Sequence, residues 1–300
     1  MQFQQTLKKK YTFEGKGLHT GRYAHMTVCP APVNTGIVFV RTDADNATVT
    51  ALAENVSNTA RSTTISQNGA SVSTIEHILS ALTGMGVDNA LIEIDNIEVP
   101  ILDGSAKPYI DAIWADGFEL QDEPRKYIEI KETVEVVNEE VGSIVRIEPA
   151  EEFSYDIKVD FNSRVLGVQH AVWNPSVVYA EEIGVCRTFV FFHEIEFLFN
   201  NGLVKGGDVD NAIVIVEHPV TEQQISRMSE LFNIPALSVR EDGYLSNLQL
   251  RFPNECARHK LLDLIGDLRL AGGFLKAKIT AFKAGHGINT TAARKIRENI

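Results

Sequence analysis

The sequence predicts an α+β protein of two domains with related build, each packing helices against a β-sheet. The first observation is that both halves follow one order: several short strand-like segments, a helix ending in glycine, an apolar strand and a second helix. The second is the charged stretch 119–127, "ELQDEPRKY", in which Pro124 indicates an interdomain linker. We therefore expect domains at 1–122 and 127–300, with a ligand site in the cleft between them.

The first domain opens with short segments that are rich in β-branched and aromatic residues and bounded by Gly, Pro or Asn. These predicted strands are 11–15, 23–30, 36–42 and 60–66. Apolar residues then recur at helical spacing in 71–86, which closes on glycines. Segment 87–95 predicts a strand, and 103–117 predicts a second helix with Ser105 as its N-cap.

The second domain repeats this order. Its first predicted strands are 126–137, 142–150 and 153–161. Segment 186–216 predicts a helix between glycine turns, followed by a strand, and the polar stretch after it is expected to be rich in loops. The chain then closes with a helix at 255–268, a strand at 274–282, a loop around "KAGHGIN" and a helix at 290–299.

Composition narrows the class of protein. The formal net charge of −12 argues against nucleic-acid binding, which needs a basic surface. An anionic small molecule would have to be met by a few local lysines and arginines. No run approaches the roughly 18 apolar residues of a membrane span, so any membrane association would be peripheral. Three cysteines without a CxxC pair suit a reducing cytoplasm.

The predicted helix 255–268, "ECARHKLLDLIGDL", places His259, Asp263 and Asp267 on one side, four residues apart. Its leucines and isoleucine form an apolar stripe on the opposite side. Spacing alone favours a solvated polar face. The same spacing also suits chelation, because an imidazole nitrogen and a carboxylate oxygen can converge on zinc. A catalytic zinc would need a third protein ligand from elsewhere in the chain.

Two other histidines have neighbours that favour a function. Glu76 directly precedes His77 on a predicted helix, as in helices that place a general base beside a zinc ligand. The alternative is a capping box from Ser73 to Glu76, and the two interpretations are about even. His286 lies between glycines at a strand end, where Asp267 could keep it protonated. A structural role is favoured for the remaining histidines: His19, His25, His170, His193 and His218.

Several short motifs, taken together and in this order, resemble the UDP-3-O-acyl-N-acetylglucosamine deacetylase family over essentially the whole chain. They are "GLHTG", "STIEHILSAL", "ILDGSA", "RTF" followed by "GLVKGG", "RHKLLDLIGDL" and "AGHGIN". Members of that family are zinc enzymes of the committed step of lipid A synthesis. The resemblance implies an active site between the two domains, with His77, His259 and Asp263 as zinc ligands. It also implies that Glu76 is the general base for the attacking water.

The resemblance implies further roles around this site. His286, oriented by Asp267, would stabilise the intermediate or protonate the leaving amine, and Thr188 would help hold the oxyanion. Phe189 would border the substrate pocket. The anionic nucleotide part of the substrate would face two lysines, Lys260 and Lys283.

The resemblance also covers cofactor and partners. The substrate would be an acylated UDP-sugar, and Fe²⁺ could replace zinc in the cell. Segment 187–216 matches the family's β-α-β insert, which holds the acyl chain, and some relatives carry a fused dehydratase domain after the last helix. Two alternatives are a zinc hydrolase acting on another acylated amine and a non-catalytic module that binds a sugar nucleotide or an acyl chain.

Overall fold

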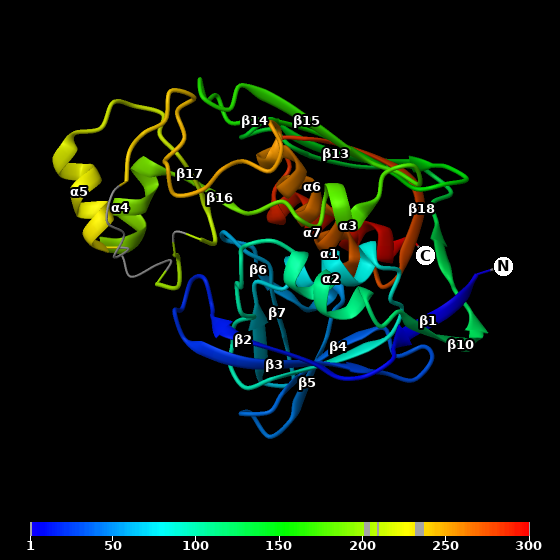
Figure 1. Cartoon of the computed structure of the whole chain (residues 1–300). Helices are drawn as coiled ribbons and strands as arrows, with labels where there is room; N and C mark the ends of the chain where they lie inside the picture. Colours follow the sequence, from blue (N-terminus) through cyan, green and yellow to red (C-terminus); the bar gives the residue numbers. More distant parts are fainter. Residues whose placement is uncertain (1, 201–204, 209, 232–236, 300) are drawn as a thin grey trace.

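The computed structural model describes residues 2–200, 205–208, 210–231 and 237–299. Two β-sheets form its outer layers, and the main helices lie between them (Figure 1). These helices are α1 (Glu76–Gly84), α2 (Lys107–Trp114), α6 (Glu255–Leu268) and α7 (His286–Glu298). No helix among the described residues is long and apolar enough to cross a membrane.

The first sheet has five strands in the order β2-β3-β9-β4-β5. They are β2 (Tyr11–Lys16), β3 (Tyr23–Pro30), β9 (Ala90–Ile94), β4 (Ile37–Arg41) and β5 (Ala47–Thr50). Strand β9, which follows helix α1, takes the centre because it pairs antiparallel with β3 and parallel with β4. Along β4 and β9 every second side chain is buried, as expected for a sheet with one face against the core.

The second sheet repeats this arrangement position for position, in the order β12-β13-β18-β14-β15. Its strands are β12 (Val134–Asn138), β13 (Ser143–Pro149), β18 (Phe274–Phe282), β14 (Ser154–Asp160) and β15 (Val168–Trp173). Strand β18 follows helix α6 and again takes the centre, antiparallel to β13 and parallel to β14. A short strand, β11 (Tyr127–Glu129), also pairs with β18. The prediction of an α+β protein with two related halves is therefore confirmed.

Helices α1 and α6 pack against each other in the middle of the molecule. Each is covered by a sheet as well as by the other helix, so in α6 only Arg258 and Lys260 are not buried. The polar row His259, Asp263 and Asp267 is at most 1% exposed. The solvated face that spacing alone favoured is therefore wrong, because a second helix covers the side that would have met water.

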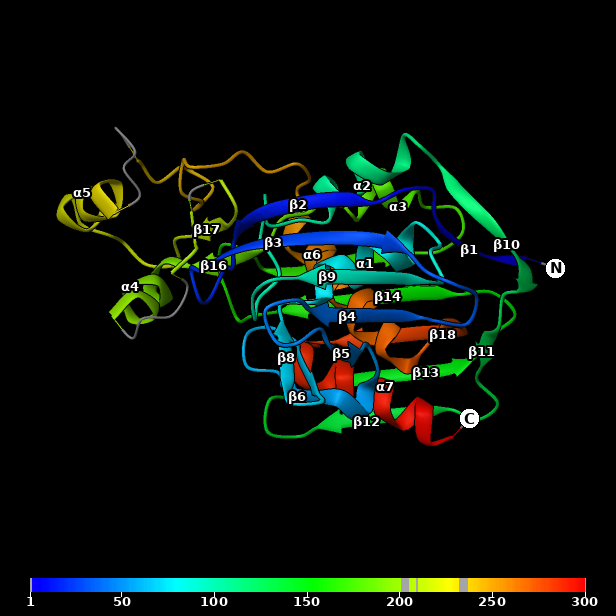
Figure 2. The same ribbon diagram turned by 90° about the horizontal axis from the view of Figure 1, so that it is seen from below.

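A smaller unit projects from one end of the molecule (Figure 2). It contains β16 (Phe189–Phe191), α4 (Phe192–Asn200), β17 (Ile213–Ile215) and α5 (Glu222–Leu231). Strands β16 and β17 pair in parallel with α4 between them, which is a β-α-β arrangement. The unit has apolar cores of its own, one of which includes Phe192 and Val214. Residues 202–204, the first part of the "GLVKGG" motif, lie outside the described residues.

The remaining short elements flank these layers. They are β6 (Val56–Asn58), β7 (Thr64–Gln67) and β8 (Ala70–Ser73), which form a small sheet, the 3₁₀ turns η1 (Ala53–Asn55) and η2 (Arg269–Ala271), and the helix α3 (Tyr179–Glu182). Strand β8 ends at Ser73, three residues before α1 begins. The first half thus reaches its buried helix through a three-stranded ribbon.

The expected linker at 119–127 is not an open linker. Residues Phe118–Pro124 form strand β10, which runs antiparallel to β1 (Phe3–Leu7). Both strands of a two-stranded ribbon are edge strands, and edge strands tolerate proline. Arg125 then forms an ion pair of 2.7 Å with Asp88, so the chain is held to the first half beyond the end of β10.

Two helix starts also differ from the prediction. Helix α7 begins at His286 rather than at residue 290, because Asn289 N–H already donates to the Gly285 carbonyl and closes the first turn. Helix α2 begins at Lys107, with Ala106 as its N-cap instead of Ser105. The Ser105 hydroxyl still accepts a hydrogen bond from the Lys107 N–H, at 3.1 Å.

Candidate metal centre

Three potential metal ligands meet where α1 and α6 cross. One ligand atom from each of His77, His259 and Asp263 lies within 4.8 Å of the others, and all three residues are buried. Asp263 Oδ1 lies 3.6 Å from His77 Nε2 and 3.4 Å from His259 Nε2. This is the one such group that the described part of the chain forms. The spacing within α6 supplies two of the ligands, and the fold brings the third from the other half.

The surroundings of His259 hold its ring ready for a metal. Its Nδ1 lies 3.0 Å from the Cys186 carbonyl oxygen, which can only accept a hydrogen bond. The proton is therefore assigned to Nδ1, which leaves the lone pair of Nε2 facing Asp263. Burial lowers the pKa of His259 to about 3, so the imidazole is neutral at physiological pH, as a metal ligand must be.

The two oxygens of Asp263 have different environments. Oδ2 accepts a hydrogen bond of 2.8 Å from Lys260 Nζ. Oδ1 is buried and has no hydrogen-bond partner among the described residues. Burial opposes ionisation, but the positive charge of Lys260 holds the pKa of Asp263 well below its usual range. A buried carboxylate oxygen without a partner is costly unless a cation binds it, so the group fits a divalent metal.

Glu76 lies beside His77 but does not cap the helix. The N-cap of α1 is Ile75, with no side-chain cap bond, and Ser73 belongs to strand β8. The capping-box alternative is therefore wrong. Glu76 Oε2 instead accepts a hydrogen bond of 3.0 Å from the Thr63 backbone N–H. Burial raises the pKa of the Glu76 carboxyl, which is the direction a general base near neutral pH requires.

Asp267 holds His286 in place. Its Oδ2 lies 3.0 Å from His286 Nδ1 and accepts a second bond of 2.9 Å from Asn289 Nδ2. Its Oδ1 accepts a bond from the Thr63 hydroxyl. Burial opposes a charge on His286, but the carboxylates of Asp267, Glu76 and Asp263 outweigh it and raise the pKa to about 9. His286 is therefore a cation at neutral pH.

Phe189 and Thr188 come from the segment that enters β16. The Phe189 ring lies 6.4 Å from the His259 ring, and Lys260 Nζ lies 5.6 Å from the Phe189 ring centre. Thr188 is fixed through its backbone, since its N–H donates to Gly104 and its carbonyl accepts from Ile213. Its neighbour Cys186 is the residue that orients His259. The structure thus places residues 186–189 against α6, the helix that carries His259 and Asp263.

Lys283 has its described contacts outside this cluster. Its Nζ pairs with Asp160 at 3.2 Å, and its backbone N–H donates to the Lys158 carbonyl of β14. Of the residues expected to bind substrate, it is the one that no described contact connects to the three ligands.

The sequence interpretation missed two residues of the site. Thr63 joins Glu76 to Asp267 through its N–H and hydroxyl, and it is fully buried. His19, assigned a structural role, has a buried Nε2 without a partner among the described residues. Burial lowers its pKa, and the charges of His77 and His286 act on it. The glycines around His19 resemble those around His286, and that similarity was the available signal.

Glu98 fixes the position of His19. This buried carboxylate accepts hydrogen bonds from the backbone N–H groups of His19 and Thr20 and from the Thr74 hydroxyl. Thr74, just before α1, has a left-handed backbone with φ of 58°. One carboxylate therefore ties the glycine-rich turn to the start of the helix that carries Glu76 and His77.

Comparison with known proteins shows the family to which the chain belongs. A family model described as UDP-3-O-acyl N-acetylglycosamine deacetylase matches residues 4–233 and 233–298. The chain belongs to this deacetylase family. The family resemblance of the short motifs is thereby confirmed.

Three relatives show how much of the chain is shared with this deacetylase family. A bifunctional enzyme LpxC/FabZ of Porphyromonas gingivalis is 44% identical and covers 100% of this chain, which spans 65% of that relative. Another, of Bacteroides thetaiotaomicron, is 42% identical over 99% of this chain and 65% of the relative. A UDP-3-O-acyl-N-acetylglucosamine deacetylase of Teredinibacter turnerae is 38% identical over 98% of this chain and 89% of the relative. The chain thus spans about two thirds of the two bifunctional relatives.

Proposed function

We propose that this chain is a zinc-dependent deacetylase that hydrolyses the N-acetyl group of UDP-3-O-acyl-N-acetylglucosamine and releases acetate, the committed step of lipid A biosynthesis. The observation that carries the proposal is the buried, unpartnered Oδ1 of Asp263, which faces the Nε2 atoms of His77 and His259. Two imidazoles and one carboxylate suit zinc and leave a coordination position open. Fe²⁺ also accepts this ligand set and is the alternative metal in the cell.

The chain's own residues supply the proton transfers. When bound, zinc would polarise the acetamide carbonyl and lower the pKa of a water molecule. Glu76 takes a proton from the attacking water, whose oxygen bonds to the carbonyl carbon. Cationic His286, held by Asp267, stabilises the negative charge and gives its proton to the amine as the C–N bond breaks. The Thr188 hydroxyl donates to the developing oxyanion.

We assign substrate binding to three further residues. Phe189, beside His259, borders the sugar. Lys260 is bonded to Asp263 and provides positive charge at the edge of the site for the diphosphate. Lys283 would have to leave its ion pair with Asp160 to reach the nucleotide, so we expect its contribution to be the smallest of the three.

The insert at 187–216 is proposed to hold the acyl chain. Strand β16 begins directly after Thr188, so the β-α-β unit adjoins the residue proposed to hold the oxyanion. Among its apolar residues, Phe192 and Ile195 pack in the unit's own core, whereas Phe197 is 60% exposed. The apolar residues Leu198 and Phe199 belong to the same helix, and their side chains lie outside the described set.

The domain limits and cellular context are proposals as well. We assign domains to 1–122 and 127–300 on the strength of the two repeated sheets, although β10 crosses the first limit. A cytoplasmic location is supported by three cysteines that are all free and buried. A fused dehydratase domain in the full-length protein is supported by the bifunctional names of two relatives.

A metal assay coupled to acetate release tests the proposal. The purified protein should contain about one zinc or iron per chain and release acetate from the UDP-linked substrate. Asp263→Asn removes the charge that faces both imidazoles, and we expect it to lower metal content and activity together. Metal content near zero after gentle purification, with no acetate release from the metal-reloaded protein, would favour a non-catalytic binding module. Equal turnover of substrate without the long 3-O-acyl chain would favour a hydrolase of another acylated amine.

A further inference from the structure

A cavity of about 370 Å³ lies at the C-terminal ends of α1 and α6, the two helices that carry the proposed metal ligands. Its wall includes residues 83–86 at the end of α1 and Arg269 just after α6. At a rise of 1.5 Å per residue, Met85 lies about 12 Å from His77 along the axis of α1. The cavity is therefore separate from the metal centre, and its volume falls in the range of small-molecule sites.

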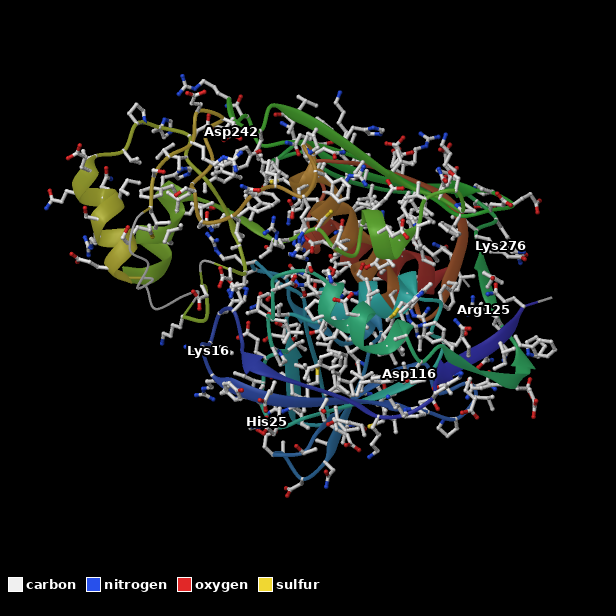
Figure 3. All side chains as sticks on the ribbon, in the orientation of Figure 1. Lys16, His25, Asp116, Arg125, Asp242 and Lys276 are labelled. Carbon is white, nitrogen blue, oxygen red and sulfur yellow. The ribbon has the colours of Figure 1, made fainter. Side chains whose placement is uncertain are left out.

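The wall of this cavity is positively charged, although the protein is acidic. The chain has 40 acidic and 28 basic residues, yet none of the residues that line the cavity is Asp or Glu. Two arginines, Arg125 and Arg269, line it. Figure 3 shows Arg125 at the end of the molecule away from α4 and α5. A cavity of this sign in a protein with net charge −12 points to an anionic ligand.

Only one of the two guanidinium groups is paired with a carboxylate. Arg125 Nε and Nη2 donate to Asp88, whereas Arg269 Nη2 donates to the carbonyl oxygens of Val87 and Asp88. Arg269 Nη1 is buried and has no partner among the described residues. Burial lowers the pKa of Arg269 to about 10, so it is charged at neutral pH. One positive charge and a buried donor thus remain uncompensated.

The rest of the wall is aromatic. The Phe274 ring packs against both guanidiniums, with its centre 4.1 Å from Arg125 Cζ and 4.3 Å from Arg269 Cζ. The Trp173 ring lies 4.5 Å from Phe153 and 5.3 Å from Tyr155. Flat surfaces of this kind favour a planar ring as ligand. Among the described residues of the wall, Arg269 Nη1 is a buried donor without a partner, which favours an acceptor group on that ring.

We propose that this cavity is a binding site for a planar aromatic anion, such as an aryl carboxylate, with the anionic group at Arg125 and Arg269 and the ring against Trp173 and Phe153. The unpartnered Nη1 of Arg269 can donate to a carboxylate oxygen, and aromatic faces match the ring. This proposal does not depend on the proposed deacetylase activity, because no residue of the cavity belongs to the metal centre.

The chain provides its own reporter for a test. It has two tryptophans, and Trp114→Phe would leave Trp173, in the cavity wall, as the only one. This protein is titrated with 4-nitrobenzoate, and in parallel with its neutral isostere 4-nitrobenzamide, while Trp173 fluorescence is recorded. We expect saturable quenching by the acid and binding of the amide that is about tenfold weaker or more. Equal affinity for acid and amide, or quenching that does not saturate, would overturn the proposal.

Two variants in the same background locate the binding. Val177→Phe fills the cavity and should abolish saturable quenching, with circular dichroism confirming the fold. Arg125→Gln and Lys276→Gln each remove one positive charge, but only Arg125 lines the cavity (Figure 3 labels both). The Arg125 variant should lose at least about tenfold in affinity and the Lys276 variant less than about twofold. Unchanged affinity in the Val177 variant would refute the site even if Arg125→Gln fails to fold.

Discussion

At the scale of single residues, Glu76 and His77 are adjacent in the chain but have separate partners. Glu76 is bonded to the Thr63 backbone, while His77 faces Asp263. This separation should allow the proposed base to be changed without disturbing the proposed metal ligands. It also means that a loss of activity can be assigned to the proton transfer rather than to the metal.

Glu76→Gln should keep the fold and the metal but lose about 10²–10⁴ in deacetylase rate, because the amide can accept the Thr63 bond yet cannot take a proton. Metal content, thermal unfolding and acetate release are measured together. Glu93→Gln makes the same change on a more exposed face of β9 and should leave all three unchanged. An active Glu76 variant would remove this residue from the mechanism.

His286 provides a prediction on pH. Its pKa is raised to about 9, so activity that needs the cation should decline as pH rises through about 9. Asp267→Asn removes the negative charge that contributes most to raising the pKa of His286, so the decline in activity should move toward neutral pH. A pH-rate profile measures the shift, and an unmoved alkaline limb would show that another group causes it.

The same pair affects stability in a defined direction. The folded-state pKa of His286 lies above the unfolded value near 6.5, so the charged pair stabilises the protein fully below that value. The contribution is lost as pH rises through about 9. Denaturant unfolding at pH 6 and pH 10 should therefore show a smaller difference in Asp267→Asn than in the unaltered protein.

Contacts between single residues could be predicted from the sequence where they depend on spacing within one helix. His259 and Asp263 form a pair because i,i+4 residues meet on any helix. Thr63 and His19 could not be found this way, since their positions depend on how a ribbon and a turn fold against α1. The burial of the polar row was missed for the same reason, because helical spacing does not reveal what covers a face.

At the scale of elements, the crossing of α1 and α6 is set by Gly266. A Cβ atom at this position would lie 2.0 Å from the backbone oxygen of Glu76, which is far inside van der Waals contact. The two helices therefore approach one another closely only because this side chain is absent. The distance between the base and the ligands of α6 depends on that approach.

Gly266→Ala should force the helices apart, reduce the free energy of unfolding by about 1–3 kcal/mol and weaken metal binding. The control is Gly287→Ala in α7, where the nearest atom to the new Cβ is the Thr59 hydroxyl at 3.5 Å. That change should stabilise the protein slightly, because alanine favours a helix over glycine. Denaturant unfolding and metal titration of both variants make the comparison. Equal behaviour of the two variants would contradict the steric role of Gly266.

Most elements could be predicted from the sequence because their periodicity is local. The strand β10 could not, since its charged sequence resembles a linker and only pairing with β1, more than 100 residues earlier, makes it a strand. The start of α7 was placed too late because glycines around His286 suggested a loop. There the bond from Asn289 to Asp267 of another helix helps hold the first turn.

At the scale of the whole molecule, the three proposed metal ligands come from both halves. His77 belongs to the first half, and His259 and Asp263 belong to the second. A metal that binds this group stabilises the folded arrangement of both, and the gain is about 4 kcal/mol when free metal exceeds its dissociation constant a thousandfold.

Removal of the metal with a chelator should therefore lower the unfolding temperature of the entire chain, and restored metal should recover it. Chelator already saturated with metal serves as the control. Asp263→Asn should be nearly insensitive to the chelator. If the chelator left the unfolding temperature of the unaltered, metal-loaded protein unchanged, metal binding at this group would not stabilise the fold.

The repeated order of elements could be predicted at this scale, because each half shows the same sequence of strand-like and helical patterns. The pairing that puts β9 and β18 in the centre of their sheets could not, since parallel and antiparallel neighbours leave no distinct pattern in a strand. The close packing of the two halves through α1 and α6 likewise arises only in three dimensions.

Helices α1 and α6 occupy equivalent places in the two halves, so the metal centre lies where a pseudo-twofold relation brings two copies of one scaffold face to face. The proposed substrate has no such symmetry. The differences that the reaction needs therefore come from side chains, with the proposed base and one proposed ligand on the first copy and two proposed ligands on the second. They also come from elements that one copy alone carries, β6–β7–β8 in the first and β16–α4–β17 in the second. The two halves thus share one backbone arrangement, and their differing side chains and inserted elements determine the orientation in which the proposed substrate binds.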